Sequence, residues 1–266
     1  MRKPIQQSTG FSNTPKSQAS RRKHSLRSAD HSTKEQLAAA LINQGKHQEA
    51  EAIYKELIAD GTSNHIVYGN LAALCGMQGK LDECINLLRK LLKLKPNHPG
   101  TYHNLGTALK GKGKLDAAIT SYSKAIALNP NDPDTHYELG TAFKAKGDFH
   151  AAINSYKKAL LLNPNFSEAH NNLGIALQER GDLTAAINSY KKALRLNPSF
   201  SDAHYNLGNT LQEQGNLTSA ISSYKSALSL NPNFSEAHNN LGNALQGEGD
   251  LTAAINSYKK ALRLNP

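Results

Sequence analysis

The sequence predicts an all-α fold, a solenoid of stacked helix–turn–helix units, and three observations lead to this prediction. Proline recurs every 34 residues, at positions 96, 130, 164, 198, 232 and 266. Leu-Gly pairs recur with the same period, at 105–106, 139–140, 173–174, 207–208 and 241–242. Segments 167–198 and 235–266 are identical at 29 of 32 positions. A fixed period of this length is typical of repeat proteins whose units stack on one another.

Each unit predicts two helices separated by a glycine. In the unit 201–234, apolar and small residues recur at i, i+3, i+4 and i+7 from His204, which is the spacing of one helical stripe. Gly215 supplies the left-handed residue that ends this helix, and Asn216 caps the next one. The second helix ends before Pro232, because a residue that precedes proline avoids the α conformation. Aspartate takes the capping position at 148, 182 and 250, and the Asn-x-Ser/Thr triplets at 165, 216 and 233 are interpreted as caps at repeat boundaries.

The columns of the repeat carry a family signature. In the unit 133–166 the signature positions are His136, Leu139, Gly140, Phe143, Ala152, Tyr156, Ala159 and Pro164. This pattern resembles the tetratricopeptide repeat, or TPR, and the resemblance covers residues 31–266. The departure is position 4 of the unit, where histidine at 136, 170, 204 and 238 replaces the family's usual large aromatic residue. The resemblance implies a right-handed superhelix whose first helices line an elongated groove.

We expect a tail followed by seven repeats. Residues 1–34 carry eight Lys/Arg and one acid, which is most of the formal net charge of +10. With few large apolar residues, a basic tail over 1–30 is expected to be disordered and solubilising, and nucleic-acid contact through it is the alternative. A degenerate repeat is expected at 31–64, and further repeats at 65–98, 99–132, 133–166, 167–200, 201–234 and 235–266.

Composition favours a cytoplasmic protein that does not enter a membrane. The mean hydropathy is −0.55 and no apolar run approaches the ~20 residues that span a bilayer. The N-terminus lacks the apolar stretch of a secretory signal. Cys75 and Cys84 are too few for a disulfide framework, so they are interpreted as reduced thiols in the core.

The sequence contains no catalytic motif. HExxH, GxSxG and the phosphate-binding glycine loop are all missing, so we expect no enzyme activity, no catalytic residues and no cofactor. The position-4 histidines invite a metal hypothesis. Equivalent helices in neighbouring units lie ~10 Å apart, however, whereas Zn–N bonds are ~2 Å long. We therefore expect no bound metal, and the histidines are predicted to pack between helices.

The first helix of each unit presents polar residues on the face opposite its core stripe. Position 6 is asparagine in every unit from 65 onward except one, in which Glu138 interrupts the column. A primary amide carries both a donor and an acceptor, so a column of them can pair with the backbone of an extended peptide. Tyrosines at position 5 would add flat contact area. The predicted peptide-binding residues are Asn70, Asn104, Tyr137, Asn171, Asn172, Tyr205, Asn206, Asn209, Asn239, Asn240 and Asn243. The alternative is that duplication has copied these residues without selection.

This column resembles that of the O-linked N-acetylglucosamine transferases, in which similar asparagines hold peptide substrates. The predicted function is a non-enzymatic scaffold that binds a protein or extended peptide in the groove. The alternative is a substrate-recruiting arm of a larger enzyme, a glycosyltransferase or another transferase, with its catalytic domain beyond residue 266. A chaperone-type carboxylate clamp is excluded, because position 5 has no lysine and position 2 is mostly acidic.

Two other surfaces remain. The second helices carry a basic stripe (Lys157, Lys158, Lys191, Lys192, Arg195, Lys225, Lys259, Lys260, Arg263), interpreted as a solvated face. Nucleic-acid binding there is disfavoured because no aromatic residues are interleaved for base stacking. The last repeat has apolar residues without a following neighbour, at Leu251, Ala254, Ile255, Tyr258 and Leu262. A chain that continues is the favoured explanation, and end-to-end self-association through this repeat is the other.

Overall fold

The computed structural model describes residues 30–265, which divide into two compact units between Pro96 and Asn97. Each unit is described by itself. The predicted tail spans residues 1–30, and residues 1–29 of it lie outside the part of the chain that the structure describes.

The first unit consists of α-helices only. A helix over residues 30–43 precedes α2 (His47–Ala59), α3 (His65–Met77) and α4 (Leu81–Leu94). Neighbouring helices pack against each other in chain order, and Tyr54, Leu71 and Leu88 are buried between them. Cys75 and Cys84 are free and buried, as predicted. Burial raises the pKa of the Cys75 thiol to about 11, which keeps it protonated near neutral pH.

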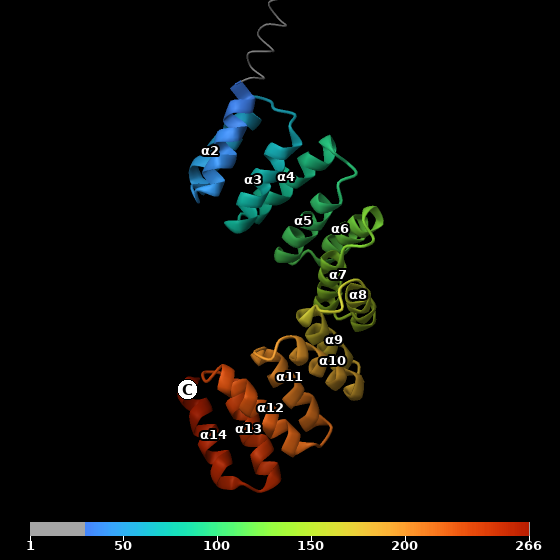
Figure 1. Cartoon of the computed structure of the whole chain (residues 1–266), viewed down its shortest axis with the longest axis vertical. Helices are drawn as coiled ribbons and strands as arrows, with labels where there is room; N and C mark the ends of the chain where they lie inside the picture. Colours follow the sequence, from blue (N-terminus) through green and yellow to red (C-terminus); the bar gives the residue numbers. More distant parts are fainter. Residues whose placement is uncertain (1–29, 266) are drawn as a thin grey trace, which may run out of the picture. The chain divides into compact units, whose positions relative to one another are not determined.

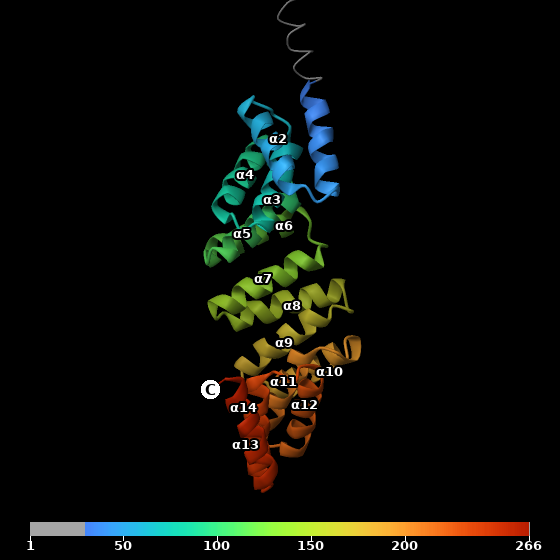
Figure 2. The same cartoon turned by 90° about the vertical axis from the view of Figure 1, so that its left-hand side faces the viewer.

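The second unit is a stack of five antiparallel helix pairs, seen from two sides in Figures 1 and 2. The pairs are α5 (Pro99–Gly111) with α6 (Leu115–Leu128), α7 (Pro133–Lys146) with α8 (Phe149–Leu162), α9 (Ser167–Glu179) with α10 (Leu183–Leu196), α11 (Ser201–Glu213) with α12 (Leu217–Leu230), and α13 (Ser235–Glu248) with α14 (Leu251–Leu264). The first helix of each pair packs on its partner, and the partner packs on the first helix of the next pair. The predicted all-α solenoid of helix pairs is confirmed, and no strand occurs between residues 30 and 265.

Local sequence signals set most of the helix ends. The glycines between paired helices have positive φ, for example +84° at Gly215. The side chain of Asp148 accepts a hydrogen bond from the backbone of Ala151, and Asn216 caps α12 in the same way. The triplet asparagines at 165 and 233 do not cap, contrary to expectation. The helix that follows residue 165 has Phe166 at its N-cap, without a side-chain cap. The backbone N–H of residue 165 instead donates to the side chain of the asparagine two residues earlier, which stabilises the turn before the helix.

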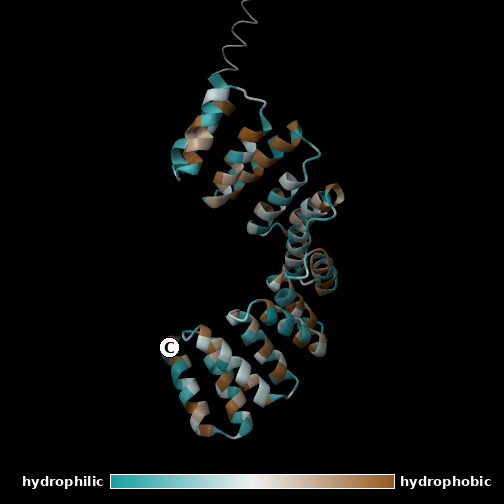
Figure 3. Ribbon diagram, viewed as in Figure 1, coloured by the Kyte–Doolittle hydropathy of each residue, from teal (hydrophilic) through white to brown (hydrophobic). Residues whose placement is uncertain are grey.

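The core is built from a tyrosine column packed on a glycine column. Tyr122, Tyr156, Tyr190 and Tyr224 are fully buried. A Cβ atom added at Gly174 would lie 2.6 Å from Cε1 of Tyr190, so only glycine fits there. Apolar and polar residues are interspersed along the helices, as Figure 3 shows by colour.

Three of the four position-4 histidines are buried between helices, as predicted, and the fourth, His204, is only half-buried. His136, His170 and His238 are buried. Nε2 of each donates to the carbonyl oxygen of the proline six residues earlier, for example His170 to Pro164 at 3.0 Å. This bond ties the first helix to the turn before it. None of the helices within residues 30–265 is both long enough and apolar enough to cross a membrane.

Candidate peptide-binding face

Three of the four position-6 asparagines of the second unit connect successive repeats. Asn172 donates through Nδ2 to the hydroxyl of Tyr137 at 2.8 Å. Asn206 donates in the same way to Oδ1 of Asn171 at 3.2 Å. Each bond runs from position 6 of one repeat to position 5 of the preceding repeat.

The next repeat extends the series. Asn240 donates through Nδ2 to the hydroxyl of Tyr205 at 3.1 Å and to Oδ1 of Asn209 at 2.9 Å. We call Asn172, Asn206 and Asn240 the amide ladder. Because all three side chains are held by the preceding repeat, the ladder has a fixed orientation along α9, α11 and α13.

The ladder retains hydrogen-bonding capacity. A primary amide has two N–H groups and one oxygen with two lone pairs. Oδ1 of Asn206 has no hydrogen-bond partner among residues 30–265, and its side chain is half-buried. Oδ1 of Asn172 accepts a bond from Nζ of Lys144 at 3.1 Å, which leaves one lone pair. A ligand along this face can therefore still find both donors and acceptors.

The position-5 residues are mainly supports for the ladder. Asn171 is only 6% exposed, so its side chain is buried beneath the face. The rings of Tyr137 and Tyr205 are half-buried and pack on Phe166 and Phe234, with ring centroids 4.7 and 4.6 Å apart. Each of these tyrosines presents only part of its ring for contact with a ligand.

An ion pair replaces the ladder where Glu138 stands. Its carboxylate accepts a hydrogen bond from Nζ of Lys110 in the preceding repeat. The side chain of Lys144 lies half-buried next to Asn172. Burial, and secondarily the charge of Lys110, lowers the pKa of Lys144. This end of the face therefore carries a partly desolvated ammonium group.

Hydroxyl groups of the buried tyrosines also reach this face, which the sequence reasoning missed. The hydroxyl of Tyr224 lies 2.8 Å from both Oδ1 of Asn209 and Oε1 of Gln212, and its one hydrogen is shared between these two acceptors. Tyr190 donates to Gln178 at 3.2 Å. Burial raises the pKa of both tyrosines, so they remain donors. The available signal was that a buried tyrosine needs a partner for its hydroxyl, and the polar columns at positions 9 and 12 supply one.

The structure brings three of the predicted residues into one cavity. Tyr205, Asn239 and Asn240 line a space of about 620 Å³ against α14, together with Tyr258 and Leu262. A cavity of this size is in the range that holds small ligands or a few peptide side chains.

The remaining predicted residues lie apart from the ladder. Asn70 belongs to the first unit, where it donates to the hydroxyl of Tyr54 at 3.0 Å. Asn104 is exposed on α5, and Asn243 accepts a bond from Tyr258 at 2.8 Å. Across residues 30–265, no group of three or more His, Cys, Asp or Glu side chains is placed to hold a metal ion.

Family comparisons identify the repeats. The profile described as TPR repeat matches residues 108–147, 140–179, 176–215 and 209–249. Two profiles described as Tetratricopeptide repeat match residues 41–109 and 235–266. No protein of curated function matches the chain.

Several solved structures have the same fold. MamA is 33% identical with a TM-score of 0.58, over 60% of this chain and 94% of MamA. YrrB, described as a TPR protein with an unusual peptide-binding site, is 24% identical with a TM-score of 0.60, over 69% of this chain and 95% of YrrB. The C-terminal part of a TPR repeat-containing protein from Cytophaga hutchinsonii is 19% identical with a TM-score of 0.72, over 87% of this chain and 95% of that one. The repeat period, the glycine–tyrosine packing and the matching profiles agree, and the chain belongs to the tetratricopeptide repeat family.

Proposed function

We propose that the protein is a non-enzymatic, cytoplasmic interaction scaffold that binds an extended peptide along the first helices of the second unit. The amide ladder is the observation that supports this most directly. Asn172 and Asn206 are each held by one N–H bond to the preceding repeat and keep a second N–H for a ligand. Asn240 uses both of its N–H groups within the preceding repeat and can offer a ligand only its oxygen. Groups that are fixed before binding lose little entropy when the ligand arrives.

The spacing of the ladder suits an extended backbone. Equivalent helices of neighbouring repeats are about 10 Å apart, and an extended chain advances about 3.3 Å per residue. About every third peptide unit of a ligand would then meet one ladder amide. Such contacts read the backbone, so we expect broad tolerance of ligand side chains. The ammonium of Lys144 next to Asn172 adds a preference for an acidic residue at that point.

The comparison with YrrB supports a peptide as the ligand class, since that protein is described by its peptide-binding site.

The test uses unphosphorylated peptides selected from a display library against the full chain. In the variant Asn172→Ala with Asn206→Ala, we expect affinity to fall about tenfold or more with helical content unchanged. Two net hydrogen bonds of about 0.5–1.5 kcal/mol each account for that loss. The matched control is Asn154→Ala with Asn188→Ala, because these exposed asparagines lie on second helices. Unchanged affinity in the ladder variant would contradict the proposal.

A second variant separates binding from repeat connection. Tyr137→Phe removes the hydroxyl that accepts from Asn172 but leaves the ladder amide in place. A ladder that only connects repeats would make this variant lose stability and leave selected peptides bound as before. A ladder that binds peptide makes affinity fall in this variant too, though less than in Asn172→Ala, because the amide is present but no longer fixed.

A substrate-recruiting arm of a larger enzyme, such as a glycosyltransferase, is the alternative, and the asparagine column favours it. The intact mass of the native protein in its source cells decides between the two, with an antibody to the repeats as the probe. A mass near 28.8 kDa supports the independent scaffold, and a much larger mass supports the arm.

A further inference from the structure

Two cavities on the second-helix side of the second unit match residue for residue. One lies among α8, α9 and α10 and has a volume of about 590 Å³. The other lies among α12, α13 and α14 and has a volume of about 750 Å³. Their lining residues are offset by 68 positions, and ten of the eleven are identical in type. The exception is Leu161, whose counterpart is Ser229.

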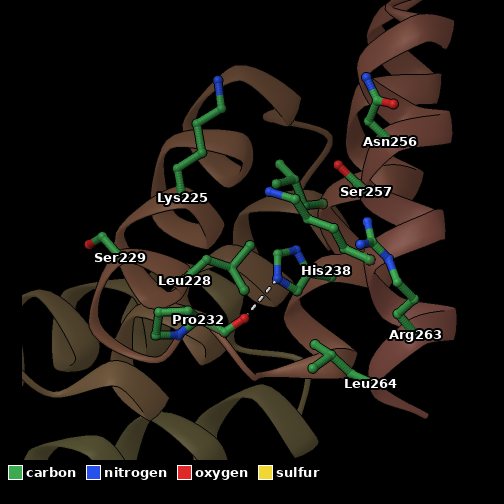
Figure 4. A pocket seen from close by; sticks show the side chains of 11 residues that line it. Lys225, Leu228, Ser229, Pro232, His238, Asn256, Ser257, Arg263 and Leu264 are labelled. Carbon is green, nitrogen blue, oxygen red and sulfur yellow. Dashed lines mark hydrogen bonds between the residues drawn. The ribbon is translucent and has the colours of Figure 1, made fainter.

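Each cavity combines an apolar floor with a basic rim. In the first, Leu160, Leu173 and Leu196 provide the floor. The polar groups of the first cavity are Lys157, His170, Asn188, Ser189, Lys192 and Arg195. Figure 4 shows the second cavity, with His238 at its centre between Leu228 and Pro232 on one side and Ser257 and Arg263 on the other.

The basic rims are not neutralised by acidic side chains. Helices α8, α10, α12 and α14 contain nine Lys/Arg residues and no Asp or Glu. No ion pair within residues 30–265 involves Lys157, Lys192 or Arg195. Uncompensated cations beside exposed apolar surface attract an anionic ligand that has an apolar body.

His170 lines the first cavity together with Lys192 and Arg195. Burial lowers the pKa of His170, and Lys192 and Arg195 lower it further, against the hydrogen bond to Pro164 that raises it. Nδ1 of this ring is buried and has no hydrogen-bond partner among the described residues. The pKa of His170 should therefore change when a charged ligand enters the cavity.

The repeat interface between the two cavities has different chemistry. At the positions of Lys192 and Arg195, helix α12 carries Ser226 and Ser229. The Lys-Lys-Arg combination therefore occurs at alternate interfaces, once with α10 and once with α14, rather than along a uniform basic stripe.

We propose that each of the two cavities binds a phosphate monoester carried on an apolar body. A phosphate monoester has close to two negative charges and three acceptor oxygens, which match two lysines, one arginine and an asparagine amide. The leucine floor accommodates the body, and the volumes lie in the range of small-molecule sites. The same group occurs on a phosphorylated metabolite and on a phosphotyrosine side chain of a partner protein.

The proposal is tested by isothermal titration calorimetry of the full chain with phenyl phosphate. We expect two sites per chain for phenyl phosphate and no measurable binding of phenol. Lys192→Gln with Lys260→Gln is expected to weaken binding at least tenfold. The matched control, Lys191→Gln with Lys259→Gln, removes the same charge one residue away from each cavity lining, and is expected to weaken binding less than twofold. Equal weakening in the two variants, or a stoichiometry other than two, would overturn the proposal.

A site-specific readout accompanies the calorimetry. Neutralising the nearby cations removes a charge that disfavours imidazolium, so saturating phenyl phosphate is expected to raise the pKa of His170 in an NMR titration. If the pKa of His170 stays the same at saturating phenyl phosphate, the ligand does not bind in this cavity and the proposal is overturned.

Two further arms distinguish the sources of the group. Free O-phosphotyrosine and a phosphotyrosine peptide are compared on the same protein, and tighter binding of the peptide assigns the cavity to a protein partner. Equal binding assigns it to a free phosphorylated compound. An oligonucleotide that bound with higher affinity than either, equally in both lysine variants, would replace the proposal with a general basic surface. These outcomes are independent of the amide ladder, which lies on the first helices.

Discussion

Gly208 and Tyr224 pack so closely that a Cβ atom on residue 208 would lie 2.6 Å from Cε1 of the tyrosine ring. The ring is fully buried and cannot move aside freely. We expect Gly208→Ala to destabilise the second unit by about 1–3 kcal/mol, the usual cost of overpacking a core. Urea denaturation followed by circular dichroism measures the change.

Gly76→Ala is the matched control for that substitution. A Cβ atom there would meet only Sγ of Cys84, at 3.8 Å, which is ordinary contact. Because alanine favours a helix over glycine by about 0.5–1 kcal/mol, this variant should be neutral or more stable. A Gly208→Ala protein as stable as Gly76→Ala would show that the tyrosine column tolerates a methyl group.

Ile187 and Ile255 occupy the same place in helices of identical sequence, yet they are 6% and 52% exposed. Ile187→Ala is expected to cost about 2–5 kcal/mol, and Ile255→Ala less than about 1 kcal/mol. Denaturation midpoints of the two variants give the comparison directly.

Equal costs for the two isoleucines would mean that another molecule or segment covers α14. Concentration dependence of the midpoint would then identify a second copy of the chain as that cover. This is the predicted end-to-end self-association, which remains a prediction.

Tyr224 and Tyr258 offer a comparison of hydroxyl bonds. The hydroxyl of each shares its one hydrogen between an asparagine oxygen and a glutamine oxygen of its own repeat, but Tyr224 is buried and Tyr258 only half-buried. We expect Tyr224→Phe to cost about 1–3 kcal/mol, because it leaves Oε1 of Gln212 without its donor next to the core, whereas Oδ1 of Asn209 keeps its bond from Asn240. Tyr258→Phe should cost less, since water can replace its hydroxyl, and a thermal melt of each variant shows the order.

The stability of the first unit should depend on Glu51 in acid. Hydrogen bonds from Lys55, then Lys80 and Gln78, lower the pKa of its carboxyl to about 2, from an ordinary 4.5. A lowered folded-state pKa contributes stability above the unfolded value, and that contribution is lost as the pH falls from about 5 toward 2. The destabilisation caused by Glu51→Gln should therefore be largest near pH 7 and shrink toward pH 2.

Glu49→Gln on the same helix provides the comparison, since Glu49 is exposed. Its effect on the denaturation midpoint should be small at every pH. A pH-independent loss in Glu51→Gln would show that packing, rather than charge, accounts for that residue.

The sequence was most informative where structure depends on near neighbours. Gly215 and Asn216 end one helix and begin the next because their own φ preference and side chain suffice. The asparagine at 165 was misassigned because α9 begins at Ser167, which puts Phe166 rather than residue 165 at the N-cap. Each of these outcomes depends on a few adjacent residues.

The candidate site was only partly predictable, because its details depend on contacts 35 residues apart. Asn171 was expected to face a ligand, but the neighbouring repeat covers it and uses it as an acceptor for Asn206. Lys157, Lys192 and Arg195, which line the cavity around His170, were interpreted as part of a solvated basic face. The existence of the cavity depends on how side chains of three helices leave space, which no periodic pattern encodes.

The identity of α10 and α14 also gives the chain two competing registers while it folds. Helix α9 meets the same 14 residues in α14 as in its native partner α10. Pairing α9 with α14 would loop out residues 180–250 and still bury the same apolar stripe, at an entropic cost that grows only slowly with loop length. Near-identical repeats therefore allow a mispaired intermediate that must come apart before the native pairs can form. Refolding should become faster once substitutions make α10 and α14 different.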